Sequence, residues 1–280
     1  MMMANAANEH ATLIGNIYYI LNSNTTAGVT WGNSGGYTGD IHIPNTVEYD
    51  GVTYDVKYIG DDAFCNCTGL SSITFPDNLQ SIGASSFKGC TGLSSVLLPK
   101  DVTVIRVNAF EDCTGLTSIS LPENLESIFN SAFSRCTGLT SVTIPSKVKS
   151  IGGFAFSGTT NLKEVFVYSD SLTSVDEAGV WSKEIPTYVK ATSFKNYKGN
   201  LFKSYNVKVL PDDGNIGDAL KGEFNFSEEE AEVINRLLSI RSTMGTKQEG
   251  PAIEVTDQDG NVLKLYNPKK VNFIKVTTNE

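Results

Sequence analysis

The chain has 280 residues, of which 40% are hydrophobic and 10% aromatic, a composition typical of a globular protein. Its formal net charge of -9 at pH 7 disfavours binding to nucleic acid, whose phosphates need a basic surface, and to anionic lipid. No stretch reaches the roughly 18–20 continuous apolar residues of a membrane-spanning helix. We therefore expect no nucleic-acid partner and no membrane span.

Residues 1–12 are small and polar, and we expect a disordered tail there. This tail lacks the basic and apolar blocks of a secretory signal, which leaves two alternatives. The protein is cytosolic, or it is exported and its signal is absent from this chain. Three consecutive methionines are typical of an engineered or misassigned start, so we expect the second alternative.

Residues 13–58 are predicted to form an N-terminal β cap with a protruding hairpin. Strand-forming residues fill Tyr18–Leu21 and Val29–Trp31. The segment Tyr49-Asp50-Gly51-Val52 carries a hairpin turn signal, because Asp-Gly favours a tight turn between strands. Such a cap would cover the apolar end of the first repeat.

Residues 59–211 are predicted to form a solenoid with a C-terminal cap, and a repeat with a period of 23 residues runs through this region as far as about Tyr168. Three columns share this period: Phe64, Phe87, Phe110, Phe133 and Phe156; Leu70, Leu93, Leu116, Leu139 and Leu162; and Cys67, Cys90, Cys113 and Cys136, followed by Thr159. A fixed period of this length predicts a solenoid in which each repeat is one coil stacked on the last. We expect two short strands in each coil, separated by a proline, and a terminal cap near residue 211.

The cysteines are interpreted as part of the core. Five is an odd number, and four of them share one repeat column, which disfavours a disulfide framework. Cys65 and Cys67 have no second pair nearby, and His10 and His42 lie elsewhere, so four zinc ligands are not available. We predict four reduced, buried thiols, a partly exposed Cys65, and no metal or cofactor.

Residues 212–280 are predicted to be a linker followed by a small α+β module. Ser227 and Glu230 form a capping box before an amphipathic helix, Ala231–Ile240. Three strands are expected after it, at Ile253–Thr256, Asn261–Tyr266 and Val271–Val276. The acidic run Asp257–Asn261 is interpreted as a hairpin turn, because its glycine is misplaced for a calcium loop.

The repeat resembles the BspA-like leucine-rich repeat family, also called the Treponema pallidum type. The resemblance rests on Ile82-Gly83, Phe87, Cys90-Thr91-Gly92-Leu93 and Leu98-Pro99, and on the same columns in neighbouring coils. It implies a β-rich leucine-rich repeat solenoid on a bacterial surface or in the secreted fraction. It also implies adhesion to host extracellular-matrix proteins or to other partners.

Candidate binding residues come from the outward columns of the strands. A parallel stack would present small hydroxyls at steps of about 4.8 Å, followed by larger groups at its end. These positions are Ser72, Thr74, Ser95, Ser118, Ser120, Ser141, Thr143, Glu164, Phe166 and Tyr168. The simplest alternative is that serine and threonine merely tolerate exposed strand positions.

We expect a monomeric, non-enzymatic binding protein, since no G-x-S-x-G, H-E-x-x-H or P-loop pattern occurs. Two other functions stay open. One is a glycan-binding accessory protein of a nutrient-uptake system, with sugars stacked on Tyr18, Tyr37, Tyr49 or Trp181. The other is a structural spacer whose active part is the segment 222–280.

Overall fold

The computed structural model describes residues 11–32, 36–176, 179–190, 193 and 196–209, and the backbone of strands at 253–256, 262–265 and 274–276. The chain divides into two compact units. The first comprises Met1–Val165 and Ser171–Ile185, and the second Phe166–Asp170 and Pro186–Glu280. The repeats lie in the first unit.

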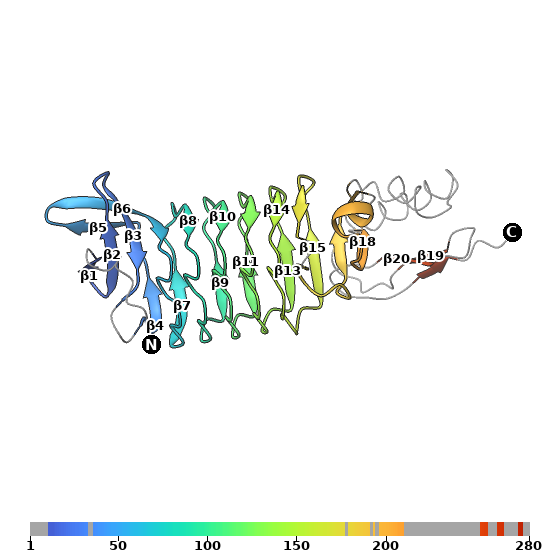
Figure 1. Ribbon diagram of the computed structural model, residues 1–280, viewed down its shortest axis with the longest axis horizontal. Helices are drawn as coiled ribbons and strands as arrows, with labels where there is room; N and C mark the ends of the chain where they lie inside the picture. Colours follow the sequence, from blue (N-terminus) through green and yellow to red (C-terminus); the bar gives the residue numbers. More distant parts are fainter. Residues whose placement is uncertain are drawn as a thin grey trace. The chain divides into compact units, whose positions relative to one another are not determined.

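A long sheet runs along the first unit, with one short strand from each coil (Figure 1). Its order is β1 (Ala11–Ile14), β2 (Ile17–Leu21), β3 (Thr26–Thr30), β6 (Val52–Ile59), β8 (Ser81–Ile82), β10 (Val104–Ile105), β12 (Ser127–Ile128), β14 (Ser150–Ile151) and β16 (Ser174–Val175). Parallel pairing places Ile82 beside Ile105 and Ile128 beside Ile151. These partners are one 23-residue period apart, so the predicted β-solenoid is confirmed.

The N-terminal strands carry a hairpin formed by β5 (Thr46–Tyr49) and β6. Its turn residues Asp50 and Gly51 both have positive φ, 51° and 75°. This geometry is the one that an Asp-Gly hairpin turn requires, so the predicted hairpin is confirmed. Figure 1 shows the hairpin projecting from the side of the sheet near the start of the stack.

A second row of strands lies across the core from the long sheet. It consists of β4 (Gly39–His42), β7 (Leu70–Thr74), β9 (Ser95–Leu97), β11 (Ser118–Ser120) and β13 (Ser141–Ile144). The strand β4 pairs in parallel with β7, and β9 pairs in parallel with β11. The pairs are neighbours, since β7 lies next to β9 and β11 next to β13. The chain therefore returns to the same row once in each coil.

The phenylalanine column forms a continuous stack through the core. Ring centroids of Phe64, Phe87, Phe110, Phe133 and Phe156 follow one another at 5.0, 5.0, 5.3 and 5.0 Å, with nearly parallel planes. All five side chains are buried. Each buried phenylalanine contributes on the order of 1.5–3 kcal/mol through burial, and each stacked pair adds about 0.5–1.5 kcal/mol.

The cysteine column links successive coils by hydrogen bonds. The thiols of Cys90 and Cys113 each donate to the carbonyl oxygen of the phenylalanine in the preceding coil, Phe64 and Phe87, over 3.0 Å. Cys136 repeats this contact with Phe110. All five cysteines are free thiols, four of them buried and Cys65 only partly so. The prediction of a buried, reduced column is confirmed.

Two loop columns adopt left-handed backbone conformations, which sequence reasoning did not identify. The first holds Asp62, Ser85, Asn108, Ser131 and Phe154, and the second holds Asn66, Gly89, Asp112, Arg135 and Gly158. Small polar residues and glycine tolerate this region best. The glycine column Gly60, Gly83 and Gly152 has a different cause: a Cβ on Gly83 would lie 2.5 Å from the Gly60 carbonyl carbon.

The second unit contains β17 (Thr187–Val189) and β18 (Val207–Val209), which pair in parallel, and the short π-helix η2 (Tyr197–Leu201) between them. The expected strands near the C-terminus are confirmed as β19 (Ile253–Thr256), β20 (Val262–Leu265) and β21 (Ile274–Val276). The antiparallel pair β19–β20 is the expected hairpin. The predicted linker and the helix Ala231–Ile240 lie outside the described residues, and the domain boundaries at 12, 58 and 211 stay predictions.

Candidate functional site

The outward side of β7, β9, β11 and β13, with the residue that precedes β9, β11 and β13, forms a continuous surface that we call the strand face. Its residues are Ser71, Ser72, Thr74, Ser94, Ser95, Leu97, Thr117, Ser118, Ser120, Thr140, Ser141 and Thr143. All of them are exposed. In each strand, the apolar residue between the last two members of this set points inward. The pleat of a strand produces this alternation, because successive side chains point to opposite faces.

The strand face carries no charged side chain. This is notable in a chain whose charged residues make up 19% of the sequence, since charges concentrate on surfaces. Charged residues are depleted at the centre of protein interfaces, where they would have to be desolvated. The composition of the face therefore fits a surface that is covered by a neutral partner.

Leu97 interrupts the hydroxyl groups at the middle of the strand face. It is 73% exposed, the largest value among the exposed large hydrophobic residues of the described part of the chain. Its register partner on β11 is Ser120, and Thr74 and Thr143 occupy the same column. Leu97 is not among the binding residues predicted from the sequence. The exposed leucine gives the face an apolar centre.

The strand β4 lies outside the strand face and borders it at the β7 edge with one polar row, which includes a charged residue. Asp40 and His42 lie opposite Ser72 and Thr74 in the parallel register, and both are exposed. The Ser72 hydroxyl donates to the Asp40 carboxylate over 2.6 Å. Neither Asp40 nor His42 was a sequence candidate, because only the tertiary pairing of β4 with β7 brings them to this surface.

The structure brings seven of the ten predicted binding residues together. Ser72, Thr74, Ser95, Ser118, Ser120, Ser141 and Thr143 all lie on the strand face. Glu164 lies on β15 (Glu164–Val167) and is partly buried, which raises the pKa of its carboxyl group. Phe166 and Tyr168 belong to the second unit, where Phe166 stacks on Tyr188 at 5.1 Å. A binding role for any of the ten stays a prediction.

The aromatic residues expected to hold a sugar are mostly in the core. Tyr37 is 5% exposed, and its hydroxyl donates to the Thr30 carbonyl oxygen. Trp181 is 3% exposed and contacts Phe156 edge to face. The expectation that Tyr37 or Trp181 stacks on a glycan is wrong, because each closes one end of the phenylalanine stack. Of the four named residues, Tyr49 is the one with a large exposed surface.

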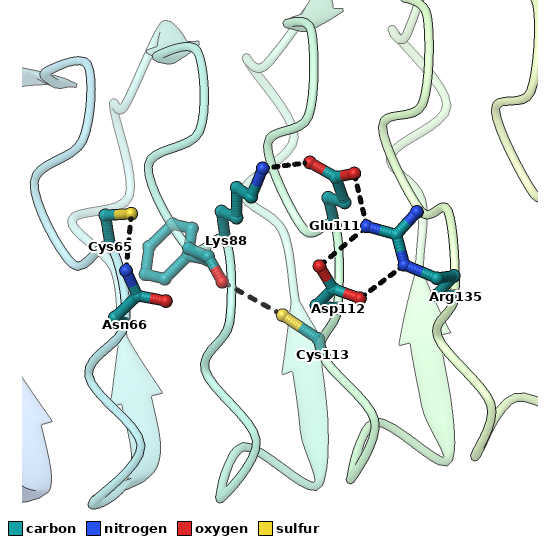
Figure 2. A network of polar contacts seen from close by, with 8 residues as sticks. Cys65, Asn66, Lys88, Glu111, Asp112, Cys113 and Arg135 are labelled. Carbon is teal, nitrogen blue, oxygen red and sulfur yellow. Dashed lines mark hydrogen bonds and ion pairs between the residues drawn. The ribbon is translucent and has the colours of Figure 1, made fainter.

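A charged cluster lies on the loops of coils two to four (Figure 2). The Glu111 carboxylate, 8% exposed as a residue, receives Lys88 at 2.7 Å and Arg135 at 2.6 Å. Arg135 also binds Asp112 at 2.6 Å, and this contact lowers the pKa of Asp112. Each ion pair joins neighbouring coils, so the cluster satisfies its own charges and supports the stack.

Chemical reactivity is low at the cysteines for which a pKa shift is resolved. Burial raises the pKa of Cys65, Cys67 and Cys90, and the neighbouring Cys136 thiol raises that of Cys113. A thiol with a raised pKa is a poor nucleophile at neutral pH. Among the described residues no group of three or more His, Cys, Asp or Glu side chains is arranged to hold a metal ion.

The comparisons with known proteins agree with this architecture. The family model described as "BspA type Leucine rich repeat region (6 copies)" matches residues 57–185. No curated protein matches the chain significantly. Within the described part of the chain, no helix has the length and apolarity needed to cross a membrane.

The chain also matches solved structures of leucine-rich repeat proteins. The T. pallidum leucine-rich repeat protein shares 24% identity with a TM-score of 0.50, over 67% of this chain and 89% of its own. A Bacteroides ovatus leucine-rich repeat protein shares 23% identity with a TM-score of 0.48, over 71% of this chain. The match covers 57% of the length of that protein. A leucine-rich cell surface protein from Faecalibacterium prausnitzii shares 21% identity with a TM-score of 0.41, over 71% of this chain and 72% of its own.

Proposed function

Residues 57–185 of this chain belong to the BspA-type leucine-rich repeat family, and from this premise we propose that the chain is a non-catalytic, adhesin-like binding protein. It acts at the bacterial cell surface or in the secreted fraction. The strand face docks on a partner protein, with Leu97 as its apolar centre. A leucine-rich repeat solenoid typically binds proteins, and it is typically not an enzyme.

One observation carries this proposal: the strand face is large, exposed and free of charge on an acidic protein. A rigid, preformed surface loses little conformational entropy on binding. Small hydroxyls donate and accept hydrogen bonds at many positions without the desolvation cost of charged groups. These properties support recognition of a neutral protein surface through shape and hydrogen bonds.

The test measures binding of the purified chain to immobilised fibronectin and fibrinogen, two extracellular-matrix proteins. We expect saturable binding that changes little between low and high salt, because the strand face contributes no ion pairs. An unrelated acidic solenoid protein is the reference surface. Binding no stronger than that of the reference would overturn the matrix-adhesion form of the proposal.

Two matched variants test whether the interaction takes place on the strand face. Ser118→Arg adds a cation at the centre of the face, and Gln80→Arg adds the same group at an exposed position before β8. We expect the first to weaken binding at least about 10-fold, since a buried unpaired charge costs several kcal/mol. The second should bind as the unmodified chain does. Equal binding by both variants would exclude the strand face.

Leu97→Ser tests the apolar anchor, because it restores the hydroxyl found elsewhere in that column. Truncating an apolar anchor typically costs an interface about 1–2 kcal/mol, a loss of about 5- to 30-fold in affinity. The substitution should not disturb the fold, since most of the Leu97 side chain is already exposed to water. Unchanged affinity would show that the contact lies elsewhere.

The alternative function is a glycan-binding accessory protein of a nutrient-uptake system. The many hydroxyls of the strand face favour it, because a neutral sugar also offers only donors and acceptors. The burial of Tyr37 and Trp181 weighs against it, since two of its expected stacking platforms are inaccessible. A glycan array probed with the unmodified chain and with Ser118→Arg separates the two functions: only glycan recognition gives a signal that the substitution removes.

A further inference from the structure

A second exposed apolar surface lies on the loops that follow β10, β12 and β14. We call it the aromatic ridge, and it consists of Arg106, Val107, Phe129 and Phe154. Val107 is 39%, Phe129 45% and Phe154 49% exposed. Each of the three contributing coils therefore turns at least one large apolar side chain toward water at the same corner.

Backbone hydrogen bonds hold these loops side by side. The Asn108 N–H donates to the Asn130 carbonyl oxygen over 3.1 Å, and the Ser131 N–H donates to the Gly153 carbonyl oxygen over 2.9 Å. The Phe129 N–H likewise donates to the Ile105 carbonyl oxygen over 2.9 Å. Hydrogen bonds between residues that are 22 to 24 positions apart in sequence thus hold successive loops next to each other.

Three of the four members of the aromatic ridge depart from the repeat. Arg106 and Phe129 occupy the column in which the other coils carry Gly60, Gly83 and Gly152. Phe154 has a φ of 58°, in a column otherwise held by Asp62, Ser85, Asn108 and Ser131. A bulky residue in this left-handed region costs on the order of 1–2 kcal/mol. Phe154 therefore has a strained backbone and a half-exposed side chain, so it stabilises the fold little. This combination points to a role on the surface.

Arg106 adds an unpaired cation to the ridge. In the part of the chain that the structure describes, its guanidinium has no ion pair and no side-chain hydrogen bond, whereas Arg135 and Lys149 are paired with acids. A guanidinium beside apolar groups is suited to a carboxylate on a partner. The complementary surface must therefore be apolar and acidic.

The β5–β6 hairpin of this same chain presents such a surface at its tip, which comprises Glu48, Tyr49, Asp50 and Val52. Tyr49 and Val52 are register partners and are 49% and 39% exposed. Glu48 and Asp50 are exposed and form no ion pair with any described residue. The hairpin projects from the stack, so its tip is free to enter a surface on another molecule (Figure 1).

We propose that the chain associates with a second copy of itself by docking the hairpin tip of one copy on the aromatic ridge of the other. Tyr49 and Val52 pack against Phe129 and Phe154, and the Asp50 carboxylate pairs with Arg106. The two surfaces differ, so the contact is heterologous and each copy keeps a free tip or a free ridge. Association therefore continues beyond a dimer unless the geometry closes a ring.

The contact is small. A phenylalanine buries about 150–250 Å² in full, so two half-exposed rings offer roughly 150–250 Å² together, well below the ~800 Å² per partner of a stable interface. Association is consequently weak and depends on concentration, and the expected monomer persists in dilute solution. The proposal is independent of the strand face, although a chain of copies would present several such faces and gain avidity.

Sedimentation equilibrium of the full chain at concentrations up to about 1 mM tests the proposal. The ridge variant carries Phe129→Ser and Phe154→Asn, and the tip variant carries Tyr49→Thr and Val52→Thr. Phe154→Asn places a residue of the favoured type at a left-handed position, and threonine suits exposed strands, so both variants should fold. Circular dichroism verifies this before the measurement.

We expect the unmodified chain to gain average mass with concentration, and each variant alone to remain a monomer. An equimolar mixture should form a one-to-one dimer, because the tip of the ridge variant meets the intact ridge of the tip variant. Arg106→Glu in the unmodified chain should weaken association at least about 10-fold. A monomeric unmodified chain, a mixture that does not associate, or a variant that associates as well as the unmodified chain would overturn the proposal.

Discussion

The buried thiol column makes the folded protein sensitive to alkaline pH. Cys67, Cys90 and Cys113 are inaccessible to water, and their thiols have pKa values raised above the ordinary range. For Cys67 and Cys90 the main cause is burial, and for Cys113 it is the Cys136 thiol together with burial. We therefore expect the folded state to lose stability when the pH is raised from 8 to 10.

The direction of this effect follows from the number of protons that the folded and the unfolded chain each bind. Above the unfolded thiol pKa of about 8.5 the unfolded chain releases protons that the folded chain keeps, so the free energy of unfolding falls as pH rises. At pH 10 each fully protected thiol lowers that free energy by about 2 kcal/mol, from RT ln(1 + 10^1.5). Two such thiols, Cys90 and Cys113, remove about 4 kcal/mol, which is a large part of the stability of a typical domain.

Urea denaturation in a reducing buffer, at steps between pH 7.5 and 10, measures this loss. Cys90→Ala should reduce the slope above pH 9 by about 1.4 kcal/mol per pH unit. Thr159→Ala is the matched control, because Thr159 is buried in the same column, in the coil after that of Cys136, and has no ionisable proton in this range. It should lower stability at every pH and leave the slope unchanged. Flat stability between pH 8 and 10, or an unaltered slope in Cys90→Ala, would refute the reasoning.

Three further changes test the stack, the strained loop and the charged cluster. Phe110→Ala, at the centre of the ring stack, should cost about 3–5 kcal/mol in urea denaturation, and a loss below about 1 kcal/mol would contradict the packing. Phe154→Asn should raise the free energy of unfolding by about 1 kcal/mol, because it relieves a left-handed phenylalanine; a lower Tm would count against this. Asp112→Asn should be less stable than the unmodified chain at pH 7, and the difference should shrink as pH falls through the pKa of Asp112, which Arg135 holds low. If Asp112→Asn and the unmodified chain have identical pH profiles of Tm, the ion pair does not contribute to stability.

Much of the solenoid could be predicted from the sequence, because every coil repeats the same environment. A buried column in one coil, such as Leu70 and its equivalents, is a buried column in all of them, so period and residue type together give the inward and outward positions. The seven predicted binding residues that lie on the strand face follow from this register. The exposed Leu97 was visible as a departure within its column, but its degree of exposure was not.

The charged cluster could not be predicted from the sequence. Lys88, Glu111 and Arg135 are each about one period apart, but ion pairs depend on which side of the loop each side chain leaves. That side depends on the backbone conformation of the loop, and the left-handed conformation of Arg135 is not one that its residue type predicts. The spacing in the sequence predicts which coil each residue belongs to, but not the direction in which its side chain points.

By itself, the sequence determined the period, the stacked core and the register of the strand face, because repetition forces identical side chains into identical positions. Only the tertiary structure decided what happens where the repetition fails. It buries Tyr37 and Trp181 against the two ends of the phenylalanine stack, and it joins the loops that carry Phe129 and Phe154 by a backbone hydrogen bond. The physical reason is that a residue outside the repeat has no equivalent in other coils, so its surroundings are set by contacts between segments distant in sequence.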